Sequence, residues 1–358
     1  MDFYSTNSLS WDKLEYGTDA IQNLHYGLIH VGLPTMIDLS KDKLPNITNG
    51  NTPKNYELCQ EGDIAFADAS EDTNEVAKAV EFYKLNGKDV ICGLHTIHGR
   101  DNQQKTVIGY KGYAFSSTAF HHQIRRIAQG TKIYSINSKN FSECFIGIPS
   151  KEEQKKIATL LRLIDERIVT QNKIIDKLQS LIKGIAQKIV HSNKTNVRLS
   201  ECVECSSSTL QESNVCEHGA YPVYGANGIV GYLDNYNTEG EAVYIIKDGS
   251  GVGTVSYVTG KCSATGTLNT LQTKEGYLLQ YLYYLLKVFN FEPYKTGMAI
   301  PHIYFKDYGK AKVFCPSYTE QLQYARLLSA IDNKLSIEQN ILTELSLQKQ
   351  YLLRQMFI

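Results

Sequence analysis

Cysteine and histidine side chains offer the first candidates for chemistry in this 358-residue sequence. Cys202-x-x-Cys205 is followed by Cys216 and His218, so four side chains of the kinds that bind zinc lie close together in sequence. Cys202, however, takes an apolar position in a strand pattern. A structural zinc ribbon also brings a second close pair of ligands, which is missing here. We favour ordinary structural roles and keep a zinc-dependent enzyme as an alternative hypothesis.

A second group consists of four histidines, His95, His98, His121 and His122. Neither their spacing nor a companion carboxylate matches a metal site, so polar or core roles are favoured.

The glycine-rich run from Gly249 to Gly253 lacks the third glycine of a dinucleotide-binding loop and follows a hairpin pattern. The sequence contains neither a phosphate-binding loop ending in Gly-Lys-Ser/Thr nor the Asn/Asp-Pro-Pro-Tyr/Phe motif of amino-methyltransferases. We therefore predict no catalytic residue, no metal site and no cofactor bound by this chain.

A third group of basic and hydrogen-bonding side chains suits contact with DNA. The formal charge is zero, which argues against a uniformly basic nucleic-acid binder. The charged residues, however, are mostly acidic between 57 and 81 and mostly basic between 100 and 139. Lysine and arginine bind phosphates, and arginine can also reach a guanine edge with two hydrogen bonds. The candidates are Arg125, Arg126, Lys132, Tyr134, Tyr224, Asn227, Lys247, Lys295, His302 and Lys306. Two solvated surfaces that neutralise each other remain the alternative interpretation of the charge pattern.

Two long helices must position these candidates. In the first, apolar residues recur at alternating steps of four and three, which is a heptad seam interrupted by Gln171. Its members are Ile157, Leu161, Ile164, Ile168, Ile175, Leu178, Ile182, Ile185 and Ile189. Pro149 marks the start, and Ser150 with Glu153 has capping-box spacing. The seam predicts a helix that needs a partner of equal length to bury its stripe.

That partner is a second copy of the same stretch, which begins at Pro316 and keeps one constant offset in numbering (316 − 149 = 167). The residues from Pro149 to Leu178 that recur between Pro316 and Leu345 include one glutamate, one glutamine and one aspartate. Glu153, Gln154 and Asp165 of the first copy correspond to Glu320, Gln321 and Asp332 of the second. The same offset also relates Gly130 to Gly297, Ile136 to Ile303 and Asn140 to Asp307. The repeat therefore includes the end of each segment that precedes a long helix.

The segments between the helices read as globular and mixed in secondary structure. Strands are predicted at 63–67, 90–92, 242–246 and 252–258, with a turn at 248–251, and helices at 115–129 and 277–289. We thus predict an α+β fold with globular domains at 1–147 and 195–313 and long helices at 148–194 and 314–358. We expect the two helices to fold back on each other as an antiparallel coiled coil, which gives the chain a pseudo-twofold internal repeat. Each helix would be about 60 Å long, so the two domains would lie roughly two turns of B-DNA apart. A bipartite DNA site fits that spacing.

These features together resemble the specificity subunit of type I restriction-modification enzymes. The resemblance rests on Pro149-Ser150-x-x-Glu153-Gln154, the helix after it, the copy that begins at Pro316 and the loops containing Gly130 and Pro301-His302-Ile303. Supporting runs are Gly62-Asp63-Ile64, Gly93-Leu94-His95-Thr96-Ile97, Gln129-Gly130-Thr131-Lys132-Ile133-Tyr134 and Tyr221-Pro222-Val223-Tyr224-Gly225-Ala226-Asn227-Gly228. One departure is that Val197-Arg198-Leu199-Ser200-Glu201, which resembles the usual first strand of a recognition domain, has no counterpart before Asp2.

The resemblance implies two target-recognition domains that each read one half of a split site in double-stranded DNA. It also implies that the helices dock two methyltransferase subunits, which carry S-adenosylmethionine, and that restriction subunits join that core. The chain itself would be a cytoplasmic reader without catalytic activity or a membrane segment. For partner docking we select the repeated polar residues Glu153, Gln154, Asp165, Glu320, Gln321 and Asp332. A coiled-coil scaffold without a DNA-binding role is the alternative hypothesis.

Overall fold

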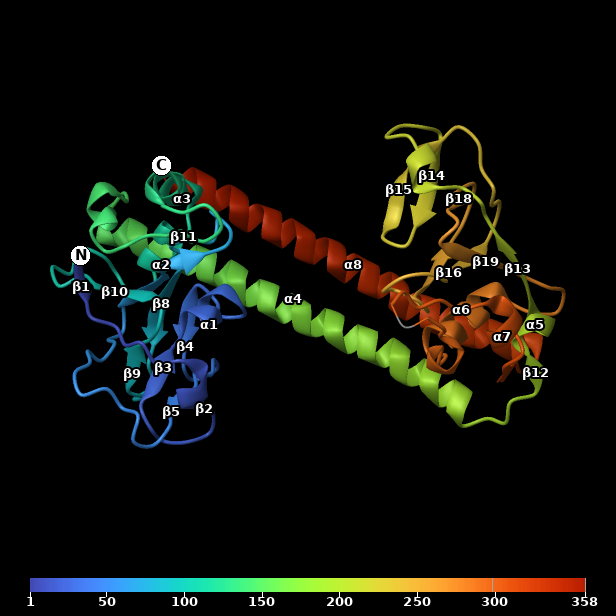
Figure 1. The fold of residues 1–358 in the computed structure, drawn as a ribbon, viewed down its shortest axis with the longest axis horizontal. Helices are drawn as coiled ribbons and strands as arrows, with labels where there is room; N and C mark the ends of the chain where they lie inside the picture. The colour runs from blue at the N-terminus through green and yellow to red at the C-terminus, as the bar shows by residue number, and fades with distance from the viewer. Residues whose placement is uncertain (298, 358) are drawn as a thin grey trace. The chain divides into compact units, whose positions relative to one another are not determined.

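The computed structural model describes residues 1–297 and 299–357. Met298, within the loop expected at 296–303, and Ile358, the last residue of the long helix predicted at 314–358, lie outside the described residues. The chain divides into two units. Unit 1 comprises Met1–Gln171 with Ile341–Ile358, and unit 2 comprises Asn172–Asn340. Each long helix contributes one part to each unit, and the units are described separately below (Figure 1).

Unit 1 contains two main sheets. One has the order β1 (Asp2–Tyr4), β10 (Thr96–Arg100), β6 (Ile64–Ala67), β8 (Ala79–Lys84) and β4 (Met36–Asp38). The other has the order β2 (Leu14–Glu15), β5 (Asn46–Ile47), β3 (Gln22–Leu24) and β9 (Val90–Cys92), and β7 (Ala69–Ser70) pairs with β11 (Tyr134–Ser135). The helices are α1 (Tyr26–His30), α2 (Lys111–Phe115) and α3 (Thr118–Ile127), with 3₁₀ turns at Trp11–Lys13 and Asn140–Glu143.

The core of unit 1 lies on both faces of the five-stranded sheet, because successive side chains of its central strands point to opposite faces. Ile64 and Phe66 of β6 pack with Phe115 and Phe120, whereas Ala65 and Ala67 pack in a second cluster with Ile37 and Phe82 and other residues. Successive residues of a strand face opposite sides, so a strand as apolar as β6 requires cover on both. The predicted strands at 63–67 and 90–92 are confirmed within one residue.

Unit 2 is built around a sheet with the order β13 (Val203–Ser207), β19 (Leu268–Thr273), β16 (Ala242–Ile246) and β17 (Val255–Val258). A second sheet has the order β15 (Gly228–Leu233), β14 (Tyr221–Gly225) and β18 (Ser263–Ala264), and β12 (Val197–Arg198) pairs with β20 (Lys312–Val313). The helices are α5 (Leu199–Cys202), α6 (Leu279–Lys287) and α7 (Phe305–Tyr308), with 3₁₀ turns at Glu212–Asn214 and Glu292–Tyr294. The predicted mixed α/β character is confirmed in both units.

The long helices are α4 (Lys151–His191) and α8 (Tyr318–Met356). Every seam position predicted in α4 is buried or half-buried, whereas Leu160, Leu163 and Leu181 outside the seam are exposed. The predicted capping box is formed and its copy in the repeat is formed too: the Glu153 carboxylate accepts from Ser150 N–H at 3.1 Å, and that of Glu320 accepts from Ser317 N–H at 3.1 Å. These caps satisfy backbone donors that the first helical turn leaves unpaired.

The two units repeat the same contacts where a long helix begins. Gln154 Oε1 accepts from Val107 N–H at 2.8 Å, and Gln321 Oε1 accepts from Leu278 N–H at 2.9 Å. The hydroxyls of two tyrosines donate to the lead-in backbone, Tyr110 to Gly147 O at 2.7 Å and Tyr281 to Phe314 O at 2.8 Å. The offset between these tyrosines (281 − 110 = 171) is larger by four than the offset between the helices. The repeat therefore extends into both globular segments, beyond the positions that share one constant offset.

One boundary differs from the sequence-based expectations. The helix predicted at 115–129 is confirmed as α3 at 118–127, but it begins later than expected, because Ser116 and Ser117 separate it from α2. The Ser117 hydroxyl accepts from Phe120 N–H at 3.2 Å and caps the start of α3, so a serine that favours helix ends interrupts the apolar pattern. In unit 2, β20 leads into α8 and pairs with β12, but in the described part of unit 1 no strand pairs with the equivalent residues 145–148.

Candidate nucleic-acid interface

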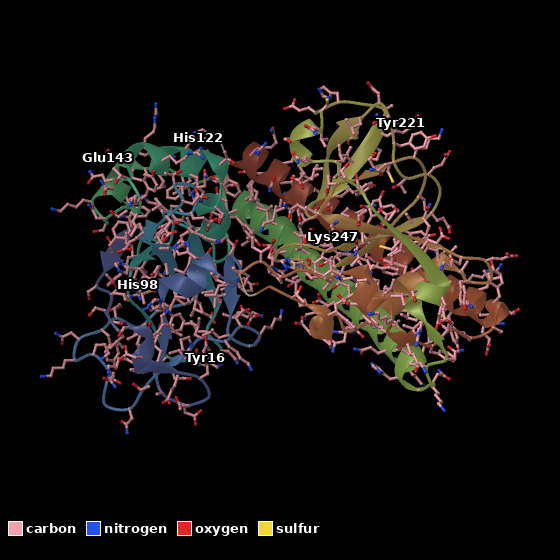
Figure 2. All side chains as sticks on the ribbon, turned by 45° about the vertical axis from the view of Figure 1, so that its right-hand side comes forward. Tyr16, His98, His122, Glu143, Tyr221 and Lys247 are labelled. Atoms are coloured by element: carbon pink, nitrogen blue, oxygen red, sulfur yellow. The ribbon has the colours of Figure 1, made fainter. Side chains whose placement is uncertain are left out.

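A closed loop before α7 gathers three of the predicted residues of unit 2. Thr296 and His302 exchange two backbone hydrogen bonds of 2.8 Å, which close the loop between them. Ile303 N–H then donates to Lys247 O at 2.9 Å, so the end of β16 lies against the loop. Lys247, Lys295 and His302 are thereby neighbours through the backbone, although they are far apart in sequence (Figure 2 labels Lys247).

The cationic side chains of this region are half-buried or exposed. Lys247 and His302 are half-buried, and the Lys295 ammonium pairs with Glu292 at 2.6 Å. Lys306 is exposed and its ammonium lies 5.2 Å from the ring centre of Tyr304. The ammonium groups of Lys247 and Lys306 can therefore contact a phosphate without rearrangement of the fold, and His302 can donate or accept a hydrogen bond.

Unit 1 forms the same loop frame at the position that the repeat predicts. Gln129 and Ser135 exchange two backbone hydrogen bonds of 3.0 and 2.8 Å, and Ile136 N–H donates to Asp68 O at 2.9 Å. Asp68 follows β6 as Lys247 follows β16. The predicted correspondence of the two lead-in loops is thus present in the backbone, and it extends to strand partners that sequence comparison did not identify.

A glycine with positive φ turns the chain at the same position in each loop. Gly130 has φ +141° and Gly297 has φ +88°. A Cβ at Gly130 would run into the carbonyl oxygen of Ile133, and one at Gly297 into that of Ile300. Only glycine combines this backbone conformation with such close packing, which explains why both copies of the loop contain it.

The side chains presented by the shared frame are of opposite charge. Where unit 2 has Lys247, unit 1 has Asp68, whose carboxylate lies 3.1 Å from His95 Nδ1. Burial raises the pKa of the Asp68 carboxyl, although His95 opposes this shift. An adjoining cavity of about 600 Å³ is lined by Tyr26, His30, Ala69, Ser70, Glu71, Asp72, Glu75, Lys78, His95 and Ile133. The two units therefore present different hydrogen-bonding groups at equivalent places.

The predicted basic residues of unit 1 lie around this loop and on α3. Arg125 and Arg126 are exposed in the last turn of α3, and one guanidinium N–H of Arg125 donates to Asn74 Oδ1 at 2.6 Å. Lys132 is exposed in the loop, and Tyr134 is half-buried against the aromatic core. Arg125 thus connects the basic helix to the acidic segment that contains Glu71 and Asp72.

Tyr224 and Asn227 lie in a different part of unit 2. Tyr224 belongs to β14 and packs its ring 5.7 Å from that of Tyr244, whereas Asn227 is exposed at the tight turn between β14 and β15. Tyr224 therefore contributes to the core, and Asn227 is the more accessible hydrogen-bonding group. Both residues belong to the β15-β14-β18 sheet and its turn, whereas Lys247 follows a strand of the other sheet.

The repeated frame matches a known protein family. The model of the family described as type I restriction modification DNA specificity domain matches residues 43–180 and again residues 191–347. This chain belongs to that family. The two matches correspond to the two copies of the frame and its following helix, and the predicted resemblance is confirmed.

Relatives of the specificity family are similar over different shares of the chain. A protein of Mycoplasma genitalium named as a putative type I specificity subunit is 26% identical over 302 residues, which cover 77% of this chain and 78% of that protein. The EcoprrI specificity subunit of Escherichia coli is 28% identical over 126 residues, 35% of this chain and 30% of that one. A crystal structure of a type I restriction-modification S subunit from M. genitalium has the same fold, with 18% identity and a TM-score of 0.64. The match covers 100% of this chain and 93% of that one.

A solved structure concerned with complex assembly and conformational transition of the type I R-M system also shares the fold of this specificity chain. It has 16% identity, a TM-score of 0.54 and coverage of 89% of both chains. None of the helices in the described part of the chain combines the length and apolar character that a membrane span needs.

The polar residues selected for partner docking mostly bond within the specificity chain. Gln154 and Gln321 are fully buried, and their amides donate to Pro149 O and Pro316 O, each at 2.9 Å. Asp165 accepts from Tyr113 O–H at 2.9 Å and pairs with Lys349 at 2.5 Å. Asp332 accepts from Tyr284 O–H at 3.2 Å. These residues thus join each helix to its globular segment, whereas Glu153 and Glu320 are exposed caps.

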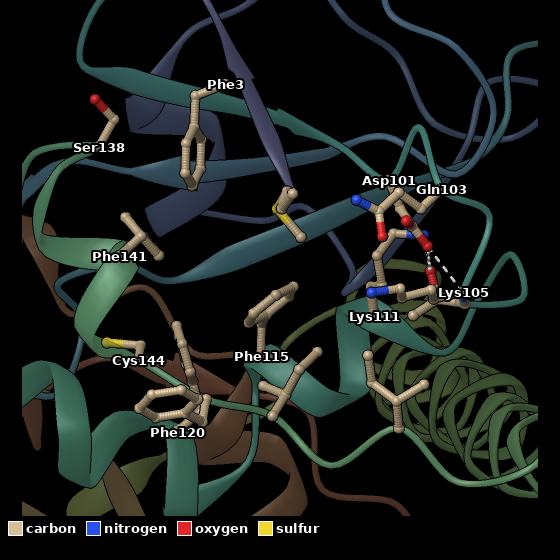
Figure 3. A pocket seen from close by; sticks show the side chains of 15 residues that line it. Phe3, Asp101, Gln103, Lys105, Lys111, Phe115, Phe120, Ser138, Phe141 and Cys144 are labelled. Carbon is tan, nitrogen blue, oxygen red and sulfur yellow. Dashed lines mark hydrogen bonds between the residues drawn. The ribbon is translucent and has the colours of Figure 1, made fainter.

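A cavity of about 580 Å³ borders the lead-in to α4 in the specificity fold (Figure 3). Figure 3 shows Phe3, Phe115, Phe120 and Phe141 on its apolar side and Asp101, Lys105 and Lys111 on its polar side. Phe145 and Ile148 of the lead-in are 76% and 48% exposed. The equivalent lead-in of unit 2 is covered by β12 and α5, where Leu199 and Cys202 are fully buried. The two copies of the frame therefore differ most at this edge.

Sequence reasoning missed Asp68 and the acidic wall of the cavity near His95. The signal that could have found Asp68 is its position directly after a predicted strand, the same position that Lys247 takes after β16. His95 has φ +54°, a conformation uncommon for a residue other than glycine, which places its ring against Asp68 and Tyr26. The sequence spacing between His95 and the other histidines does not indicate that its ring contacts Asp68 and Tyr26.

Proposed function

We propose that this chain is the non-catalytic DNA-specificity subunit of a type I restriction-modification complex, with each globular domain reading one half of a bipartite site. Membership of the specificity family supports the role. The observation that carries the finer proposal is the shared loop frame, which presents Lys247 in one unit and Asp68 in the other. A common frame with different polar groups suits two readers of different half-sites, because lysine pairs with acceptors such as guanine O6 and N7 while a carboxylate accepts from cytosine N4.

The proposed organisation places target-recognition domains at 1–147 and 195–313 and spacer helices at 148–194 and 314–358. We infer that the helices form an antiparallel coiled coil about a pseudo-twofold axis, with each about 60 Å long. The repeated bonds of Gln154 and Gln321 support this arrangement, since they fix each helix start to its own domain in the same way. The helices would thereby set the separation of the half-sites.

DNA contact is proposed to combine phosphate binding with reading of base edges. The exposed cations Arg125, Arg126, Lys132 and Lys306 suit phosphates, and the half-buried Lys247, Lys295 and His302 suit the groove. Asn227 suits adenine because its amide can donate to N7 and accept from the N6 amino group in a bidentate pair. Tyr134 and Tyr224 would support the neighbouring loop and strand.

Two methyltransferase subunits carrying S-adenosylmethionine, and restriction subunits joined to them, are the proposed partners. The fold shared with the structure on type I complex assembly supports this proposal. We propose docking beside the two helix starts, with Glu153 and Glu320 accessible at the surface. Gln154, Asp165, Gln321 and Asp332 would act there by holding each helix against its domain.

The test is a domain exchange followed by mapping of methylated DNA sites. The chain is produced with the modification subunits of its own system, and residues 1–147 are replaced by the recognition domain of another specificity subunit. The expected result is a new first half-site with the second half-site unchanged, and DNA binding that weakens steeply with salt because phosphate contacts release counterions. An unchanged bipartite site, or assembled complexes that do not bind DNA, would favour a scaffold role instead.

A further inference from the structure

Two cysteines and a histidine that are not among the proposed DNA-binding residues meet in the core of unit 1. Cys59, Cys92 and His98 are 5%, 2% and 0% exposed, and one ligand atom from each lies within 4.8 Å of the other two. The two sulfurs are 3.6 Å apart. Cys59 and Cys92 are distant in sequence, so this grouping depends on the fold.

The strands place these ligands between the two sheets of unit 1. Cys92 ends β9 of the four-stranded sheet, and Cys59 N–H donates to Val90 O of the same strand at 2.8 Å. His98 is the central residue of β10 in the five-stranded sheet and pairs with Ala65 of β6 (Figure 2 labels His98). A bond from each side chain to a common ion would therefore connect one sheet to the other.

The imidazole of His98 is prepared to act as a ligand. Its Nε2 lies 2.7 Å from Asp63 Oδ2, and its Nδ1 is buried without a hydrogen-bond partner among the described residues. Asp63 is in turn held by Arg100, whose Nε and Nη2 donate to its two oxygens at 2.9 and 2.8 Å. A carboxylate that accepts from one ring nitrogen fixes the neutral tautomer with its lone pair on the other, which is the usual surrounding of a metal-bound histidine.

Ligand chemistry then selects the class of ion. Two thiolates and an imidazole favour thiophilic cations such as Zn²⁺ over Mg²⁺ or Ca²⁺, which prefer oxygen. Two thiolates also neutralise a divalent charge, so burying the ion leaves no net charge in the core. We propose that Cys59, Cys92 and His98 supply three protein ligands to one Zn²⁺ ion. None of the three is among the residues proposed to contact DNA, and the site differs from the expectation of no metal drawn from the sequence.

A bound ion would also stabilise part of the proposed interface. His95, which contacts Asp68, lies between Cys92 and His98 in sequence, so both flanks of its turn would be fixed. Loss of the ion should therefore loosen the loop at 93–95 before the rest of unit 1.

Unit 2 offers a matched control. The sulfurs of Cys202 and Cys315 lie 3.7 Å apart, but among the described residues these two cysteines belong to no group of three potential ligands.

The test is the metal content of the full chain, purified under reducing conditions without added chelator and measured by plasma mass spectrometry. One equivalent of zinc is expected, with loss of that zinc in Cys59→Ser and Cys92→Ser and full retention in Cys202→Ser. Zinc replaced by Co²⁺ should give the thiolate-to-cobalt charge-transfer absorption, and Cys92→Ser should remove it. Because a serine variant can fail to fold, wild-type protein treated with a chelator is also followed by hydrogen exchange at 93–95.

Three results would overturn the proposal. Zinc below one tenth of an equivalent in folded wild-type protein that also fails to take up added Zn²⁺ or Co²⁺ would exclude the site. Intact mass showing a Cys59–Cys92 disulfide in protein purified under reducing conditions would assign the pair to redox chemistry. Zinc that persists in folded Cys59→Ser and Cys92→Ser proteins would place the ion elsewhere.

Discussion

The buried amide of Gln154 offers a quantitative test of how the first long helix is attached to its domain. Its oxygen accepts from Val107 N–H at 2.8 Å, and its nitrogen donates to Pro149 O at 2.9 Å and Lys105 O at 3.1 Å. The side chain is fully buried. Truncation in Gln154→Ala therefore removes three hydrogen bonds and leaves their backbone partners without this side chain.

The expected loss follows from the number of bonds. A hydrogen bond contributes about 1 kcal/mol net, and a buried partner left unsatisfied costs about 1–3 kcal/mol, so Gln154→Ala should lower the free energy of unfolding by about 2–4 kcal/mol. Gln321→Ala removes the two corresponding bonds to Leu278 and Pro316 and should cost about 1–3 kcal/mol. We therefore expect Gln154→Ala to be destabilised more than Gln321→Ala, and this order is a sharper test than either absolute value.

Gln154→Glu separates hydrogen bonding from packing. The glutamate keeps the shape and the acceptor for Val107 N–H, but its carboxylate cannot donate to Pro149 O or Lys105 O. The variant should be destabilised at neutral pH and should recover part of that loss in acid, because a protonated carboxyl can donate one bond. Alanine truncation has no such pH dependence of its own.

Urea unfolding followed by circular dichroism measures these differences, and hydrogen exchange of residues 105–110 and 151–160 locates them. Gln179→Ala, at an exposed position of the same helix, is the matched control and should change stability by less than about 0.5 kcal/mol. If Gln154→Ala matched that control, or if exchange increased equally throughout unit 1, the assignment of Gln154 as the attachment of α4 would be refuted.

Three further predictions concern the loops, a buried carboxylate and DNA contact. Gly130→Ala and Gly297→Ala should each distort a lead-in loop and cost about 1–3 kcal/mol or more, checked by thermal unfolding, whereas Gly184→Ala at an open position of α4 should be neutral or stabilising. Burial raises the pKa of Glu81, although Lys111 and the N–H groups of Gly109 and Gly112 oppose the shift. A raised carboxyl pKa favours folding at low pH and that contribution is lost as pH rises through it, so Glu81→Gln should flatten that part of the pH–stability curve; an unchanged curve would contradict the shift. Lys247→Ala should weaken DNA binding by the assembled complex and, if it contacts one phosphate, reduce the salt slope by about 1; equal slopes would show that Lys247 makes no phosphate contact.

The sequence determined the elements whose signals are local. The seam of α4, the Ser150–Glu153 cap and its copy at Ser317–Glu320 were readable because helix periodicity and capping involve residues three or four positions apart. The repeat and the positions of its glycines were also readable, as they need only one constant offset. The start of the helix predicted at 115–129 was misplaced because the apolar pattern continued across Ser117, the serine that caps α3.

Only the tertiary structure decided which distant groups meet. The sequence contains Asp68, Lys247, Cys59 and His98, but their partners lie on strands and loops many residues away, and no local period encodes which strands pair. Gln154 illustrates both levels: its repetition was visible in the sequence, but its burial and three bonds depend on where residues 105–107 return to the helix. Chain return is fixed by burial of the whole apolar surface, which is a property of the assembled core and not of any single segment.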